Sequence, residues 1–199
     1  MITLPLRMLA AVAPAMGNID IRYYLNGVHI EHVQGGVIAV ATDGRALIAA
    51  RETLLNIEPF APFIMPRDTV LELLKAGRKI ENFSMSEGVV AYGGVTRLFA
   101  PIDGQFPDWR AVIGNAAQPL EATSFDPDVL EIPLKAAQAL KRRGLMRYAS
   151  VAFEMAGESS TRFTLSNLPD GMRVSGVVMP QRKRHDVDIA ADIAGILRP

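Results

Sequence analysis

The 199-residue chain contains no cysteine. This absence excludes disulfides, thiolate nucleophiles and the cysteine-based spacings of zinc fingers. An excess of one charge is lacking too, because 21 Lys and Arg residues balance 21 Asp and Glu residues. Proteins that bind nucleic acid through their overall charge carry a clear positive excess. Any contact with DNA must therefore come from basic side chains gathered on one surface.

Long apolar runs are also missing, although 49% of the residues are hydrophobic, enough for a substantial core. No segment approaches the roughly 18 apolar residues of a membrane span. The apolar N-terminus, residues 1–17, invites a test for a secretory signal. Its only charge, Arg7, lies inside the apolar run, and Pro5 and Pro14 interrupt it, against the pattern of such signals. We expect a soluble, cytoplasmic protein with no membrane partner.

The groupings that catalysis requires are scarce. His29 and His32 lie three apart on a predicted strand and so point to opposite faces, a poor arrangement for a metal. Pro107-Asp108 is not followed by the acidic-x-Lys that completes a nuclease motif, and no glycine pair precedes the Lys-Ser/Thr of a phosphate loop. We expect no enzyme, no catalytic residue, no metal and no cofactor, and a hydrolase or nuclease is the weakest alternative.

What the sequence does contain is a pattern that recurs three times: a short extended segment, a helix with an apolar stripe, and alternating strands. The extended segments are residues 2–5, 63–66 and 124–127. Prolines in these segments suit a first helical turn, and Asp126 can cap the free amides of the third helix. Gly77 and Gly144 suit helix ends. Pro133 predicts that the third helix begins late or bends.

Strands with a period of two follow each helix. They are predicted at 21–30, 37–41 and 47–50, then 83–85, 89–92 and 97–101, then 151–155, 162–165 and 172–179. Gly35-Gly36 and Asp43-Gly44 favour hairpins between the first of these. The sequence thus predicts an α+β fold of three βαβββ repeats, with helices on one face of antiparallel sheets.

Domain boundaries follow from composition. Residues 1–114 are predicted to form one complete domain of two repeats, 1–57 and 58–114. After a polar linker near 115–119, residues 119–182 form a half domain, the third repeat. Residues 183–199 form a C-terminal tail with a basic hinge and a short amphipathic helix, which could dock on its own chain or on a neighbour.

Four motifs carry a family resemblance. They are Arg22-Tyr-Tyr-Leu-Asn-Gly27, Ala41-Thr-Asp-Gly-Arg-Ala-Leu47, Asp103-Gly-Gln-Phe-Pro-Asp-Trp-Arg110 and Val177-Val-Met-Pro-Gln-Arg182. In this order, they resemble the bacterial DNA polymerase III beta subunit, or sliding clamp, family. The resemblance implies the DNA clamp fold, in which helices line a central hole and sheets form the outside. It also implies a non-catalytic processivity factor for DNA replication.

The resemblance also bears on assembly. The chain matches the family's middle domain and half of its last domain, so it is a shortened version. Since the family's ring contains about a dozen repeats, a chain with three needs roughly four copies to close it. We expect a homo-oligomeric ring, a tetramer in preference to a trimer or an open dimer.

A sliding ring must hold phosphates without reading bases. Basic residues on the second and third helices are expected to face double-stranded DNA: Arg67, Lys75, Arg78, Lys79, Lys135, Lys141, Arg142 and Arg143. Without the resemblance, these would be ordinary solvated helix residues, several of them favoured near helix C-termini by the helix dipole.

The resemblance further implies an apolar pocket for short linear motifs of DNA polymerases, clamp loaders and repair proteins. The matching residues are Leu25, Thr42, Gly44, Leu47, Pro107, Val112, Val177, Val178, Met179 and Pro180. Their mostly small apolar character suits a preformed pocket, although plain core packing is the alternative for several of them. At the rim, the resemblance shows departures: Ala46 and Ala111 stand where the family commonly has arginines, Arg45 where a histidine is frequent, and Gln181 where a methionine is usual. A different peptide preference is therefore expected.

Two functions therefore stand. The first is a processivity clamp that encircles DNA and tethers replication proteins. The second is a clamp-fold adaptor or decoy that binds replication proteins or a host clamp without encircling DNA.

Overall fold

The computed structural model describes residues 1–53, 57–76, 80–86, 88–114, 124–154 and 160–181. The order of elements is β1 (Ile2–Pro5), α1 (Leu6–Val12), the 3-10 turns η1 (Ala13–Ala15) and η2 (Tyr23–Leu25), β2 (Gly27–Val33), β3 (Gly36–Thr42), β4 (Ala46–Thr53), β5 (Phe63–Pro66), α2 (Arg67–Lys75), β6 (Asn82–Ser86), β7 (Val89–Tyr92), β8 (Val95–Leu98), α3 (Trp109–Gly114), α4 (Pro127–Arg142), β9 (Ser150–Glu154), β10 (Thr161–Ser166) and β11 (Met172–Val178).

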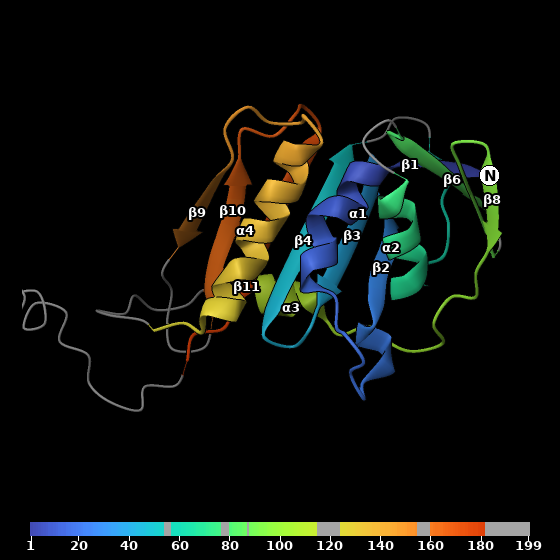
Figure 1. The fold of residues 1–199 in the computed structure, drawn as a ribbon. Helices are drawn as coiled ribbons and strands as arrows, with labels where there is room; N and C mark the ends of the chain where they lie inside the picture. The colour runs from blue at the N-terminus through green and yellow to red at the C-terminus, as the bar shows by residue number, and fades with distance from the viewer. Residues whose placement is uncertain (54–56, 77–79, 87, 115–123, 155–159, 182–199) are drawn as a thin grey trace, which may run out of the picture.

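The strands form two antiparallel sheets. The larger has seven strands in the order β5-β2-β3-β4-β11-β10-β9, and the smaller has four in the order β1-β6-β7-β8. Helices α1, α2 and α4 lie side by side over one face of the larger sheet, and α3 lies on the opposite face (Figure 1). The expected α+β class with helices on antiparallel sheets is confirmed.

Alternation along the strands produces two cores. On β3, Val37, Ala39 and Ala41 face the helices and join the main core. Ile38 and Val40, between them in the sequence, join a smaller core beneath α3. Because both faces of β3 are covered, all seven of its residues are buried. The sheet therefore offers two separate surfaces, one beneath the helices and one beneath α3.

The helix ends follow the local chemistry of the sequence. Pro5 and Pro66 end their strands as N-cap residues, while the Asp126 carboxylate accepts a hydrogen bond from the Asp128 N–H at 2.9 Å, as predicted. Gly144 closes α4 with a φ of +74°. The predicted late start of the third helix is wrong, since α4 begins at Pro127 and continues through Pro133.

Two other sequence predictions need correction. The predicted strand 21–30 begins only at Gly27, because the chain before it closes into a turn. In that turn the Asp20 N–H donates to Asn26 Oδ1 at 2.9 Å, and Asn26 Nδ2 donates back to the Asp20 carbonyl at 2.9 Å. Ser124, Phe125 and Asp126, predicted as an extended segment, do not belong to a strand. Residues 115–123 and the tail 183–199 lie outside the described residues.

Within the described residues, no helix combines the length and apolar character needed to cross a membrane.

Candidate functional site

A cavity of about 190 Å³ lies on the α3 side of the larger sheet, where β3, β4 and β11 meet α3. Its floor is apolar, formed by the buried side chains of Leu47 and Val177, both members of the smaller core. The structure brings eight of the ten expected pocket residues to this cavity: Leu25, Thr42, Gly44, Leu47, Pro107, Val112, Val177 and Met179. They come from four separate parts of the chain.

Val178 and Pro180 do not line the cavity. Val178 follows Val177 on β11, so its side chain points to the opposite face and is buried in the core beneath the helices. Met179, just beyond the strand, is held by a hydrogen bond from its N–H to the Arg45 carbonyl at 2.9 Å. Its side chain is 44% exposed at the rim, where it can contact a ligand.

The turn between β3 and β4 shapes one side of the cavity. Asp43 Oδ1 accepts hydrogen bonds from the N–H groups of Arg45 and Ala46, at 2.8 and 2.9 Å. Gly44 has a φ of +87°, a conformation that favours glycine. A Cβ at Gly44 would lie 2.8 Å from the Arg22 guanidinium, so glycine also makes room for that side chain.

Arg22 and Tyr24 line the rim, although the sequence did not single them out for the pocket. Arg22 pairs with Asp20 at 2.7 Å and donates to the Asp43 carbonyl at 3.2 Å. Hydrogen bonds from Arg22 lower the pKa of Asp20 to about 2. Arg22 and Tyr24 lie beside Leu25 in the first motif, and this was the signal in the sequence that could have assigned them to the pocket. The apolar floor is thus bordered by a guanidinium whose charge Asp20 compensates.

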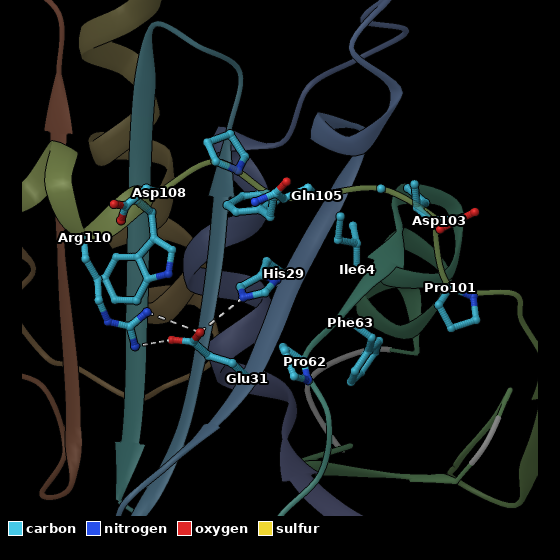
Figure 2. Close-up of a pocket in the computed structure, with 15 residues that line it drawn as sticks. His29, Glu31, Pro62, Phe63, Ile64, Pro101, Asp103, Gln105, Asp108 and Arg110 are labelled. Carbon is cyan, nitrogen blue, oxygen red and sulfur yellow. Dashed lines mark hydrogen bonds and ion pairs between the residues drawn. The ribbon is translucent and has the colours of Figure 1, made fainter.

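A second cavity, of about 620 Å³, lies on the same side of the sheet (Figure 2). Glu31 on β2 accepts a hydrogen bond from Arg110 on α3 at 2.5 Å and contacts His29 Nε2 at 3.3 Å. The His29 ring stacks on Phe106 with 5.0 Å between centroids, and its burial lowers the pKa of His29. This cluster fixes the segment 106–110 on the sheet, and so positions Pro107 and Val112 at the first cavity.

Among the residues that the structure describes, no three His, Asp or Glu side chains are placed to hold a metal ion.

The helix side of the sheet carries a groove of about 590 Å³ between α1, α2 and α4. Lys135, Arg142 and Arg143 from α4 line it, opposite Leu71 and Leu74 from α2. Lys75 and Lys141 are exposed on the same helices. Five expected DNA-facing residues are therefore on one side of the sheet, away from the first cavity (Figure 1).

The remaining three expected DNA-facing residues are Arg67, Arg78 and Lys79. Arg67 donates to the carbonyls of Met16 and Gly17, at 3.5 and 3.2 Å, so its guanidinium holds the start of α2 to the chain after α1. Arg78 and Lys79 lie outside the described residues. Even within the groove, Arg143 is half-buried, which lowers its pKa, and it donates to the Ile80 carbonyl at 3.4 Å. Lys75, Lys135, Lys141 and Arg142 are the more accessible cations.

Comparison with known proteins places this geometry in a family. Residues 5–108 match the family described as "DNA polymerase III beta subunit, central domain". The beta sliding clamp of Salmonella typhimurium is 32% identical over 156 residues, covering 72% of this chain and 41% of that protein. That of Proteus mirabilis is 24% identical over 200 residues, covering 96% of this chain and 52% of that protein. The chain therefore spans about half the length of these relatives.

Solved structures agree in fold. A DNA polymerase sliding clamp from Pseudomonas aeruginosa superposes with a TM-score of 0.66 at 18% identity, covering 91% of this chain and 66% of that one. The sliding clamp family is not enzymatic, in agreement with the expectation from the sequence. The chain belongs to the DNA polymerase III beta subunit family, the beta sliding clamps.

Proposed function

We propose that this chain, built of three βαβββ repeats, is a cytoplasmic processivity clamp whose copies form a ring around double-stranded DNA. The observation that carries the proposal is the separation of two surfaces by one sheet. Cations of α2 and α4 lie on the helix side, and the apolar cavity lies on the α3 side. DNA and a protein partner can therefore be bound at the same time.

The helix side suits a sliding contact. Lys75 and Arg142 are exposed, and flexible cations attract phosphates without reading bases, so no position on the duplex is preferred. Lys135 pairs with Glu131 at 2.5 Å on the same helix, which lowers the charge that it offers. The contact is therefore weak at each copy, and retention depends on closure of the ring. Four copies would supply the number of repeats that a full ring needs.

The cavity suits a short linear motif. Its volume accommodates one or two apolar side chains, and Leu47 and Val177 supply a buried floor that excludes water. Arg22 and Arg45 at the rim are about half exposed and pair with Asp20 and Asp43, so they offer a peptide hydrogen-bond donors and no net positive charge. Polymerases, clamp loaders and repair proteins are the proposed carriers of such motifs.

One fact favours the second function, an adaptor or decoy that does not encircle DNA. The chain spans only about half the length of the relatives it matches.

Retention on circular and linear DNA tests the proposal. A closed ring stays on a nicked circle at high salt and slides off when the circle is cut, whereas an adaptor is retained on neither. Replacing Lys75 and Arg142 with Gln should lower the salt dependence of DNA binding, with a log–log slope smaller by about 2. The matched control is Arg173→Gln, which removes an exposed cation from β11 on the α3 side. Equal effects of the two changes would contradict the assignment of the helix side to DNA.

A further inference from the structure

The first set of elements comprises β1, α1, β2, β3 and β4, and the second comprises β5, α2, β6, β7 and β8. Each set contributes its first strand to the sheet of the other. β1 precedes α1 but pairs with β6, whereas β5 precedes α2 but pairs with β2. Two backbone bonds repeat the exchange: the Leu6 N–H donates to the Glu81 carbonyl at 2.7 Å, and the Arg67 N–H donates to the Asn26 carbonyl at 2.9 Å. The two sets are thus related by an approximate two-fold axis, and α1 and α2 run in opposite directions.

The third set, α4 with β9, β10 and β11, has no such counterpart within the described residues. β9 is the last strand of the larger sheet, and Figure 1 shows α4 over the strands beside it, as the last of the helices that the described residues form on this face. β9 follows α4 as β2 follows α1, and the two strands differ in burial. Val28 and Ile30 on β2 are 0% exposed, whereas Phe153 on β9 is 38% exposed although its ring contacts the core residue Phe163.

The flank of α4 on this open side is apolar. Lys135, Ala139 and Arg142 line the groove shared with α1 and α2, so the side chains roughly half a turn away point in the other direction. Leu130 and Leu134, four residues apart, lie there, and Leu134 is 46% exposed. Together with Phe153 they form an apolar face at the end of the sheet that no other element of the described residues covers.

Residues 124–126 lie before α4 in the position that β5 occupies before α2. In the second set the Ile102 N–H, just after β8, donates to the Ile64 carbonyl at 3.0 Å. In the third, the Gln181 N–H, just after β11, donates to the Ser124 carbonyl at 2.8 Å. Ile64 and Ser124 each lie two residues before the N-cap of their helix. One difference is that Pro127, which matches Arg67, has no N–H, and α4 is capped by its own Asp126.

We propose that a second copy of this chain covers this face, with the third sets of the two copies exchanging strands about a true two-fold axis. The α4 helices then pack antiparallel around Leu134, and each segment 124–126 lies along β9 of the other copy. The charges agree with this pairing. Lys141, seven residues after Leu134, falls opposite residue 127 of the other copy, between the exposed or half-buried carboxylates of Asp126 and Asp128.

The pairing of two copies deepens the proposed function. Only the number of copies in the ring rests on that function. Each unit contains six sets of elements, so two units supply the number expected in the full ring. Self-complementary contacts of this kind are the commonest way in which identical chains associate.

Cysteine cross-linking tests the pairing directly, because the chain has no cysteine of its own. A Leu134→Cys variant of the full chain should cross-link to its own counterpart through a short bis-maleimide, giving a species of twice 21.6 kDa. The matched control is Ile21→Cys, whose position is 96% exposed and precedes β2, which lies toward the opposite end of the larger sheet from β9, and it should stay uncross-linked. A negative result for Leu134→Cys, or equal yields from the two variants, overturns the pairing.

Mass in solution supplies a second measurement. Phe153→Glu should halve the mass measured by light scattering while circular dichroism stays unchanged, and an unchanged mass contradicts the proposal. If Leu134→Cys cross-links only after residues 183–199 are removed, the tail and not a second copy covers the face, which also overturns it. Cross-linking with no retention on circular DNA would refute the ring alone, and retention without cross-linking would refute the pairing alone.

Discussion

Arg7 on α1 and Glu52 on β4 form an ion pair whose two members differ in burial. Arg7 Nε and Nη2 donate to the two Glu52 oxygens at 2.6 and 2.8 Å, and these bonds raise the pKa of Arg7. The Glu52 side chain is 0% exposed, while that of Arg7 is 27% exposed. Removing either partner leaves an uncompensated charge, and the cost depends on which charge stays behind.

Breaking a buried pair by removing one partner costs about 3 to 5 kcal/mol. Arg7→Met leaves a carboxylate with no access to water, so we expect a loss of about 5 kcal/mol in the free energy of unfolding. Glu52→Gln leaves a guanidinium that still reaches solvent and keeps one carbonyl acceptor, so we expect about 3 kcal/mol. The double change Arg7→Met with Glu52→Leu fills the site with apolar groups and should lie within about 1 kcal/mol of the natural chain.

Urea denaturation at one fixed protein concentration measures these differences, with the fluorescence of Trp109, the only tryptophan, as the signal. The order of the losses is the decisive result. If Glu52→Gln costs as much as Arg7→Met, the difference in burial does not control the energetics. If the double variant is no more stable than Arg7→Met, the single losses do not arise from an unpaired charge.

Two further predictions concern the α3 side of the sheet. Gly44→Ala should cost about 1 to 2 kcal/mol through its left-handed backbone and weaken peptide binding by displacing Arg22, as fluorescence polarisation can show. Gly94→Ala, with a φ of +80° and nothing within 4 Å of its Cβ, is the matched control that should lose stability without affecting binding. Burial lowers the pKa of His29 below the ordinary 6.5, so the unfolded chain binds the proton more readily and stability is lost as the pH falls below 6.5. His29→Phe, which keeps the stacking on Phe106, should reduce this loss in denaturation curves between pH 7 and pH 5, and an unchanged pH dependence would contradict the role of burial.

The sequence predicted most elements because local signals and burial agree in them. A helix was predicted directly after the extended segment 2–5, and α1 lies there at Leu6–Val12, since an apolar stripe follows a proline. The segment 21–25 was missed because its alternation resembles a strand, whereas reciprocal bonds between Asp20 and Asn26 close it into a turn. α3 was missed because six residues carry too little periodicity, and its position depends on the pair between Arg110 and Glu31, which are distant in sequence.

The pocket residues on strands could be predicted, because alternate residues of a strand point to the same face of the sheet. Leu47, Val177 and Val112 reach one cavity, as the family resemblance implied, although peptide binding there remains a proposal. Val178 could have been rejected from the sequence alone, because neighbours on a strand cannot face the same way. Arg67 could not, since its bonds to Met16 and Gly17 depend on how α2 packs beside the chain after α1.

The pairing of β4 with β11 also affects how the chain folds. Ala46 lies opposite Val178 and Glu52 opposite Met172, so the middle of the sheet closes only when the last strand arrives. During synthesis, β4 has left the ribosome long before β11 and exposes an unpaired strand edge in the meantime. Such edges recruit other chains, and distant pairings form slowly. Aggregation of the nascent chain, and its relief by chaperones, should therefore depend on how quickly the final strand is translated.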